Sequence, residues 1–385
     1  MLLSVLQIIP RLDTGGAERT TIDIARAVVA AGGTAHIATS GGRMLDEAKG
    51  AGATIHLLDA GAKNPFVIWK NAALLAGIMR MHDINIIHAR SRAPAWSALM
   101  AARRTGAHFI TTYHGIYSGG FPGKRLYNSV MARGEIVIAN SAATARHIAS
   151  VHGVTAPRVT TIPRGTDLSR FDPAAISASR KQAMRDAFSV AAETPIMLHA
   201  ARLTRWKGQK VAIEALARLK KLWPALNGGA FPALVFAGDA QGRDEYQREM
   251  ADLAARLGVA GDIRMAGHVD DVPAALAVAR VALAPSTEPE AFGRSAVEAQ
   301  AMGVPVIASK LGAQADTLID GETGLHVPPD DAASLARAMA TLLLADEATH
   351  ARFALAARKN AKTYTVEAMC AATLGVYRSV LERAP

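Results

Sequence analysis

Short apolar runs alternate with alanine-rich amphipathic segments along this chain of 385 residues. The runs of the first half predict β-strands at 2–9, 34–39, 54–58, 84–88, 108–112, 136–139 and 159–162. Those of the second half predict strands at 196–199, 234–237, 262–265, 281–284, 304–308 and 324–327. Between them lie helical segments such as 17–31 and 96–104. Continuous apolar strands separated by helices are typical of a parallel sheet covered on both faces.

A polar stretch at 168–194, without a predicted strand, divides this alternation into two halves. We therefore predict an α/β fold with two facing, doubly wound Rossmann-like domains and a connecting linker, at 1–170, 195–364 and 171–194 respectively. Ligands of open parallel sheets bind beyond the carboxyl ends of the strands, where the winding reverses. The predicted site is therefore a cleft between the two domains.

The last segment, 365–385, is predicted to be an amphipathic helix. Its apolar stripe contains Val366, Met369, Cys370, Thr373, Tyr377 and Val380. A stripe of this kind needs a surface against which to pack.

The composition narrows the class of protein. Half of the residues are hydrophobic and 20% are charged, which is ordinary for a globular protein. The single cysteine, Cys370, excludes an internal disulfide framework and fits a reducing compartment. The opening apolar run is expected to be a buried strand and not a signal peptide, and no uninterrupted run has the length of a membrane-spanning helix. We expect a cytoplasmic protein.

The net charge of +10 lies entirely in the first half of the chain. Residues 1–190 contain 22 Lys and Arg against 11 Asp and Glu, whereas the remainder contains 21 against 22. The excess is either a solvated surface or a docking surface for an anionic membrane, nucleic acid or phosphorylated acceptor. Nucleic acid is not expected, because no recognition motif accompanies the charge.

Two carboxylates, Glu290 and Glu298, are separated by seven intervening residues just after a predicted strand. We expect Glu290 in a loop and Glu298 about two turns into a helix. Eight residues span roughly 12 Å along a helix and return to a similar face. The backbone N–H groups between them would face anionic oxygens at the helix start. A nucleotide sugar, with hydroxyls at both ends and a diphosphate between, fits this pattern.

Two other loops offer candidate phosphate contacts. Gly15 and Gly16 precede a predicted helix, where they either admit a phosphate to the backbone or form a tight turn. Arg202 and Lys207 precede another helix, where they either bind a diphosphate or form a surface charge cluster.

Histidines follow two of the predicted strands. His114 lies between Tyr113 and Gly115 at a strand end, and this setting favours a place in the cleft over one in the core. For His88 we expect a place in the core.

A series of short motifs runs nearly the whole length of the chain. They are the Gly15-Gly16 loop, TYHG at 112–115, NS at 140–141, IPRGTD at 162–167, Arg202 with KG at 207–208, and Glu290 to Glu298 followed by GVPVI at 303–307. In this order and spacing they resemble the retaining glycosyltransferases with an E-x7-E motif, known as family 4. The resemblance implies the GT-B fold, hexosyl transfer from a nucleotide sugar to form an α-linked product, and a terminal helix that crosses back to the first domain.

The resemblance also implies roles for the matching positions of the second domain. Arg202 and Lys207 would bind the donor diphosphate, and Glu298 would bind the ribose hydroxyls. Glu290 would bind the hydroxyls of the donor sugar or act near its anomeric carbon. Further donor contacts are implied for Phe292, Gly293, Arg294 and Ser295, and for Val269 beside the base.

In the first domain, Gly16 would approach the diphosphate and His114 would line the sugar site, where we count it with Glu290 as a catalytic candidate. The acceptor side would include Gly15, Lys124, Arg125 and Arg164. Arg164 stands where the family more often has Asn, a departure that would alter the acceptor side. Asp316 stands where a Glu is commoner, which is a conservative change.

No metal or other cofactor is expected. The chain has no D-x-D motif, and its histidines lack the spacing of metal ligands along the sequence. The leaving diphosphate of a UDP- or GDP-linked donor would then be stabilised by Arg202, Lys207 and helix N-termini.

The expected acceptor is a lipid-linked or envelope glycan of the lipopolysaccharide kind. Near Lys124 and Arg125 lie the apolar Phe121 and Leu126, so this segment either contacts an anionic membrane or is an active-site loop with core residues. The alternative functions are a disaccharide-type synthase, a nucleotide-sugar epimerase and a non-catalytic nucleotide-sugar-binding module. A dehydrogenase is disfavoured because the dinucleotide-binding glycine pattern is missing.

Overall fold

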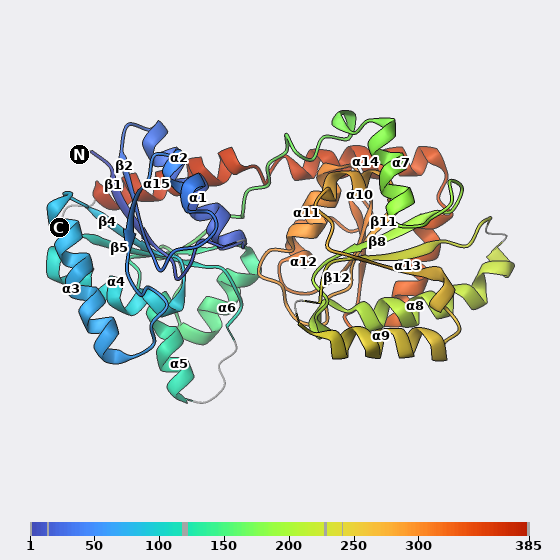
Figure 1. Cartoon of the computed structure of the whole chain (residues 1–385), viewed down its shortest axis with the longest axis horizontal. Coiled ribbons are helices and arrows are strands. Elements are labelled where there is room, and N and C mark those ends of the chain that lie inside the picture. Colours follow the sequence, from blue (N-terminus) through green and yellow to red (C-terminus); the bar gives the residue numbers. More distant parts are fainter. Residues whose placement is uncertain (1, 14, 118–121, 227–228, 241, 383–385) are drawn as a thin grey trace. The chain divides into compact units, whose positions relative to one another are not determined.

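The computed structural model describes residues 2–13, 15–117, 122–226, 229–240 and 242–382. The chain forms two compact units (Figure 1). One unit comprises Met1–Gly165 with Val366–Pro385, and the other comprises Thr166–Thr365. Each unit contains one parallel sheet with helices on both faces, so the predicted pair of Rossmann-like folds is confirmed.

The sheet of the first unit has the strand order β3-β2-β1-β4-β5-β6-β7. Its strands are β1 Ser4–Ile8, β2 Thr34–Thr39, β3 Thr54–Leu57, β4 Ile86–Ala89, β5 His108–Tyr113, β6 Ile136–Ala139 and β7 Val159–Thr161. All adjacent pairs are parallel. Each predicted strand of this half is present, with ends that differ by at most two residues.

The helices of this unit are α1 Gly16–Ala30, α2 Leu45–Gly50, α3 Pro65–Met81, α4 Arg92–Thr105, α5 Pro122–Asn128, α6 Ala142–His152 and α15 Val366–Leu381. Residues of α1, α2 and α15 share one core cluster with the sheet, and residues of α3, α4 and α6 share the cluster on its other face. Local signals fix the ends of α6. The Ser141 hydroxyl accepts a hydrogen bond from the N–H of Thr144 at its start, and Gly153 ends the helix with a φ of +65°.

The terminal helix α15 packs against α1 within the first unit. Met369, Tyr377 and Val380 are buried there, as the predicted apolar stripe requires. None of the helices in the described ranges combines the length and the apolar character that crossing a membrane would need.

The sheet of the second unit has the order β10-β9-β8-β11-β12-β13. Its strands are β8 Ile196–Ala200, β9 Ala233–Ala237, β10 Ile263–Gly267, β11 Val281–Ala284, β12 Val306–Ser309 and β13 Gly324–Val327. Its helices are α7 Ala178–Ala187, α8 Gln209–Leu222, α9 Asp244–Arg256, α10 Val272–Ala277, α11 Arg294–Ala301, α12 Gln314–Thr317, α13 Ala332–Leu343 and α14 Glu347–Ala361. The winding reverses between β8 and β11, which places the loops after these two strands at the switch point.

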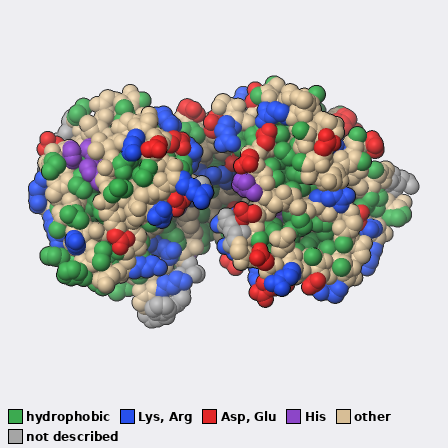
Figure 2. All heavy atoms as spheres, in the orientation of Figure 1, with side chains coloured by type: hydrophobic (Ala, Val, Ile, Leu, Met, Phe, Trp, Pro, Cys, Tyr) green, Lys and Arg blue, Asp and Glu red, His purple; other side chains and the backbone are tan. Residues whose placement is uncertain are grey.

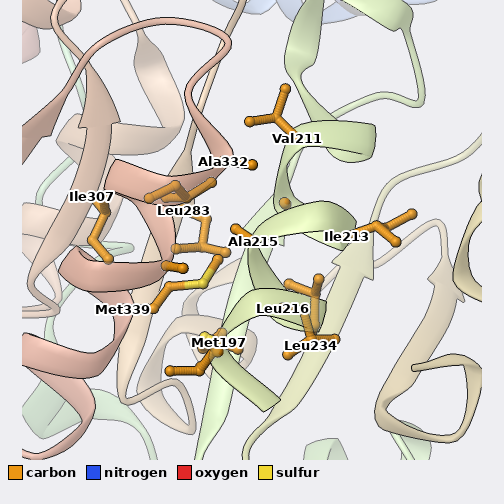
Figure 3. Packing of buried hydrophobic residues seen from close by; sticks show 14 of the residues in the cluster. Met197, Val211, Ile213, Ala215, Leu216, Leu234, Leu283, Ile307, Ala332 and Met339 are labelled. Atoms are coloured by element: carbon orange, nitrogen blue, oxygen red, sulfur yellow. The ribbon is translucent and has the colours of Figure 1, made fainter. Parts of the chain in front are cut away.

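Figure 3 shows the core on one face of this sheet. Met197, Leu234 and Leu283 extend from three strands. They pack with Leu216 of α8 and Met339 of α13, and all five side chains are almost fully buried. Burying side chains of this size contributes about 1.5–3 kcal/mol each, so this core holds the switch-point strands firmly.

The predicted linker at 171–194 is wrong, because these residues belong to the second unit. Phe171, Phe188 and Val190 are buried in its core. The guanidinium of Arg180 also forms a two-pronged ion pair with the carboxylate of Asp271, with N–O distances of 2.8 and 3.0 Å. This packing could not be predicted from the sequence, because α7 is largely polar and only a few apolar residues beside it reach the core.

Candidate functional site

The loops that follow β8 and β11 touch at the switch point of the second sheet. The backbone N–H of Thr287 donates a hydrogen bond of 2.8 Å to the carbonyl of Trp206. Gly208 has a φ of +76°, and a Cβ placed on it would lie 1.9 Å from the carbonyl oxygen of Pro285. This position therefore needs glycine both for its backbone conformation and for the close approach of the two loops.

Glu290 is the fixed centre of this site. Its side chain is almost buried, and its Oε1 accepts hydrogen bonds from Ser286 Oγ at 2.5 Å and from Gln314 Nε2 at 3.0 Å. Its Oε2 lies 2.7 Å from Lys207 Nζ. A poorly hydrated ion pair is tolerated when further hydrogen bonds satisfy its charges, and the neutral donors here do so. The structure thus brings together the predicted residues Lys207 and Glu290, and each neutralises the charge of the other.

The helix α11 begins directly after this carboxylate. Gly293 precedes it with a φ of +74°, and no side chain hydrogen-bonds to the cap. A Cβ on Gly293 would lie 2.9 Å from Cγ of Gln314. The first N–H groups of a helix have no acceptor within the helix, so this glycine-capped N-terminus is suited to anionic oxygens.

The expected position of Glu298 needs a correction. Because α11 starts only at Arg294, Glu298 lies in its second turn, and the chain between Glu290 and Gly293 is not helical. The helical arithmetic that placed both carboxylates on one face therefore does not apply. Glu298 is half-buried, and its side chain makes no hydrogen bond or ion pair with any residue in the described ranges.

Burial raises the pKa of Glu298 to about 7, and the positive charges of Arg294 and Arg170 oppose this rise. An unfolded Glu has a pKa of about 4.3, so between roughly pH 4.5 and 7 the folded chain keeps a proton that the unfolded chain releases. The unfolding free energy contributed by this group therefore falls as the pH rises through that window.

We expect Glu298→Gln to remove this loss of stability. The variant should match its parent at pH 5 and exceed it by on the order of 2 kcal/mol at pH 8. Chemical unfolding at both pH values measures the difference, and Glu322→Gln at an exposed position is the control. An equal effect of Glu298→Gln at both pH values would contradict this account.

The other predicted donor residues lie around the same loops. Arg202, in the loop after β8, is exposed, and within the described parts of the chain its side chain has no partner. Phe292 is buried with its ring edge-on to Tyr364, so its side chain supports the loop. Arg294 is exposed, and Ser295 is half-buried in the first turn of α11. Val269, after β10, is half-buried against the core.

In the first unit, His114 and Arg164 form a pair at the ends of β5 and β7. The Arg164 Nη2 donates to the Nδ1 of His114 at 3.2 Å and to its carbonyl at 3.0 Å. A guanidinium only donates, so Nδ1 is the acceptor and the ring proton lies on Nε2. This Nε2 is buried and has no partner among the described residues. His114 can therefore donate one hydrogen bond to a ligand oxygen from this nitrogen, but it cannot accept a proton there.

Burial lowers the pKa of His114 well below its usual range, and the charges of Arg164 and Arg90 lower it further. We expect Arg164→Met to raise this pKa. Without the guanidinium donor, the ring proton should no longer be restricted to Nε2. Nuclear magnetic resonance of the His114 ring against pH measures both changes. Arg103→Met, at an exposed position of α4, should leave the ring unchanged. An unshifted His114 in Arg164→Met would show that Arg164 does not set its protonation.

The remaining predictions for the first unit differ in outcome. Gly15 caps α1 and Gly16 is its first residue, but the Glu18 carboxylate lies so near that a Cβ on Gly15 would be 2.1 Å from it. An anion at this helix end would first displace that carboxylate. Lys124 is half-buried, and Arg125 donates to the carbonyl of Val151 at 2.9 Å.

The two other positions are His88 and Phe121. His88 is a core histidine, as expected, with its ring nitrogens 2.6 Å from Tyr377 Oη and 2.7 Å from Thr112 Oγ1. Phe121 lies outside the described residues.

Sequence reasoning missed Ser286 and Gln314, the two neutral partners of Glu290. Gln314 is buried and lies 24 residues further along the chain. It follows Gly312, where a Cβ would lie 2.6 Å from backbone atoms of Glu290. The sequence signal that could have indicated Gln314 is its place two residues after Gly312, which lies in the loop that follows β12.

Comparison with known proteins agrees with this arrangement. A family model described as Glycosyltransferase Family 4 matches residues 14–170, and one described as Glycosyl transferases group 1 matches residues 180–360. Proteins named D-inositol 3-phosphate glycosyltransferase from Xylanimonas cellulosilytica and Geodermatophilus obscurus are 30% and 31% identical over 66% of this chain. The matches cover 60% and 54% of those relatives, so the chain spans little more than half of their length.

Solved structures extend the likeness to the whole chain. A glycosyltransferase from Rickettsia africae ESF-5 is 31% identical with a TM-score of 0.89, over 100% of both chains. HepE from Anabaena, in complex with UDP and glucose, is 24% identical with a TM-score of 0.82 over 98% of this chain and 100% of its own, and shares the fold. The chain therefore belongs to the GT-B glycosyltransferases of the family 4 type.

Proposed function

We propose that this protein transfers a sugar from a nucleotide-sugar donor to an acceptor hydroxyl with retention of configuration, giving an α-glycosidic bond. The observation that carries this proposal is the carboxylate of Glu290, held by Lys207, Ser286 and Gln314 beside the glycine-capped N-terminus of α11. A fixed carboxylate next to a helix end with unsatisfied N–H groups suits a ligand that combines sugar hydroxyls with a diphosphate.

Each residue then has a stated task in the transfer. The acceptor oxygen forms a bond to the anomeric carbon while the bond from that carbon to the diphosphate oxygen breaks, and the proton of the acceptor hydroxyl passes to the leaving diphosphate. Negative charge grows on the leaving diphosphate, where the α11 N-terminus, Lys207 and the exposed Arg202 stabilise it. Glu290 holds the hydroxyls of the sugar, and Glu298 accepts hydrogen bonds from the ribose. In the first unit, His114 offers its Nε2–H to an oxygen of a substrate.

The donor is proposed to carry UDP or GDP. HepE, which shares this fold, was crystallised with UDP and with UDP-glucose, and this makes UDP-linked sugars the first to test. A thermal-shift screen of UDP- and GDP-sugars against the full chain identifies the donor. We expect one nucleotide series to raise the melting temperature in a saturable manner, whereas no shift with any member would contradict nucleotide-sugar binding.

For the acceptor we propose a molecule that bears phosphate, such as a lipid-linked or envelope glycan. The first unit contains 20 Lys and Arg against 10 Asp and Glu, whereas the second contains 23 of each. The net positive charge is therefore confined to the first unit, where it attracts anions. The curated relatives named above act on D-inositol 3-phosphate according to their names, which adds a phosphorylated acceptor to those worth testing.

We also propose that the first unit contacts anionic membrane. Its helix α3 exposes Phe66 and Trp69, with the Arg104 guanidinium over the Trp69 ring at 5.8 Å. Figure 2 shows hydrophobic and basic side chains together on this part of the surface. Apolar side chains beside basic ones are suited to the interface of a charged bilayer, where each cation contributes about 1 kcal/mol.

Co-sedimentation with vesicles of rising phosphatidylserine content, at low and high salt, tests this contact. We expect binding that increases with anionic lipid and weakens with salt. Two double variants show which region binds. Phe66→Ser/Trp69→Ser changes α3, and Lys124→Ala/Arg125→Ala changes the basic segment predicted from the sequence. Binding that responds to neither salt nor lipid charge would contradict the proposal.

A further inference from the structure

Three histidines far apart in the sequence meet in the first unit, on the side of the sheet that α3 covers. His36 lies on β2, His56 on the edge strand β3, and His82 at the C-terminal end of α3. A ligand nitrogen from each ring lies within 4.8 Å of those from the other two. A group of histidine side chains is visible at the surface of this unit in Figure 2.

The geometry of the closest pair suits coordination. His36 Nδ1 and His56 Nε2 are 3.1 Å apart, and the two rings are stacked with an interplanar angle of 19°. Two nitrogens bound to one Zn²⁺ at about 2.0–2.1 Å lie roughly 3.4 Å apart in a tetrahedral site. The third ring, of His82, has its centroid 4.8 Å from that of His36 and 5.5 Å from that of His56. Rotation of half-buried side chains is enough to close the widest gap.

The backbone around the three rings is fixed. His36 is buried within the sheet, and the register pairs Ala38 with His56. The N–H of His82 bonds to the carbonyl of Ile78, and its own carbonyl accepts from Ser4 Oγ at 3.3 Å. His56 and His82 are half-buried, so an ion can reach the ring nitrogens from solvent. Three candidate ligands on a fixed backbone, with an accessible fourth position, are thus available.

We propose that His36, His56 and His82 bind one divalent transition-metal ion of the Zn²⁺ class. Three imidazoles are a ligand set that suits Zn²⁺, Ni²⁺, Cu²⁺ and Co²⁺, whereas Mg²⁺ and Ca²⁺ prefer oxygen ligands. His82 lies on the loop that enters β4, towards the amino ends of the strands. The glycosyl-transfer site lies at carboxyl ends, so this ion would join β2, β3 and α3 and take no part in the transfer.

The test uses the full chain without a histidine tag, first stripped of metal with a chelator. Titration with ZnCl₂ is followed by calorimetry, and Co²⁺ is added separately to record its visible spectrum. We expect one bound ion per chain, absorption bands typical of four-coordinate Co²⁺, and a rise of at least about 2 °C in the melting temperature at saturating Zn²⁺. MgCl₂ should produce no shift.

His56→Ala and His82→Ala should each weaken Zn²⁺ binding at least tenfold. Both positions are half-buried, so these variants fold even if a change at the buried His36 does not. His108→Ala is the matched control, because His108 is also half-buried at the amino end of a strand in this sheet and pairs with Glu135. Unchanged binding in both His56→Ala and His82→Ala, or loss of binding only in His108→Ala, would overturn the proposal. So would the absence of binding by the parent chain.

Discussion

Lys207→Ala is expected to reduce turnover by about 100- to 1,000-fold, the usual cost of removing one preorganised donor from a developing negative charge. The ammonium group has two tasks in this account. It stabilises the leaving diphosphate, and before the donor arrives it balances Glu290 at 2.7 Å. Initial rates with saturating donor and acceptor measure the effect on the transfer.

The same change should lower stability only moderately. Glu290 retains its hydrogen bonds from Ser286 and Gln314, so the loss of its cation costs on the order of 2 kcal/mol and leaves the fold intact. Lys210→Ala is the matched control, since Lys210 lies on the next turn and pairs with Glu249. Near-parental turnover in Lys207→Ala would remove Lys207 from the mechanism.

Glu290→Gln is the second change for which we expect a large effect, a fall in turnover of about 100-fold or more. Glutamine keeps the shape of the side chain, and its single oxygen can still accept hydrogen bonds. It removes the negative charge that orients Lys207, and it points an amide donor at either the ammonium or Gln314. Rates and donor affinity measured separately show whether binding or the transfer suffers.

The neighbouring Glu288 supplies the control for this change. It is exposed in the same loop, so Glu288→Gln alters the formal charge of the loop without touching the fixed carboxylate. We expect it to keep nearly all of the activity. Equal losses in the two variants would indicate a general effect of loop charge, and the specific role of Glu290 would be wrong.

Most of the fold could be predicted because strands buried on both faces are continuous apolar runs. The strand predicted at 136–139 has the same ends as the observed β6, Ile136–Ala139. Residues 171–194 were missed because the information there is sparse: two phenylalanines and a few aliphatic residues bury themselves within a polar stretch. The packing of such isolated residues depends on tertiary neighbours that no local period reveals.

The site was predicted in part for a related reason. Glu290 and Lys207 are both near strand ends, and the carboxyl ends of adjacent parallel strands necessarily meet. The helix start at Arg294 could not be placed, because it depends on the left-handed Gly293 and its contact with Gln314. The grouping of His36, His56 and His82 was equally hidden, since their separations along the chain match no ligand motif.

Acceptor-dependent release of nucleoside diphosphate tests the central claim most directly. The full chain is incubated with the donor that the thermal-shift screen identifies, with and without phosphorylated acceptors, beside Lys207→Ala and Glu290→Gln. We expect release that requires an acceptor in the parent chain, a new glycoside in equal amount with α configuration, and almost no release in either variant. Donor binding without transfer to any phosphorylated acceptor, or equal release by the parent and both variants, would contradict the account.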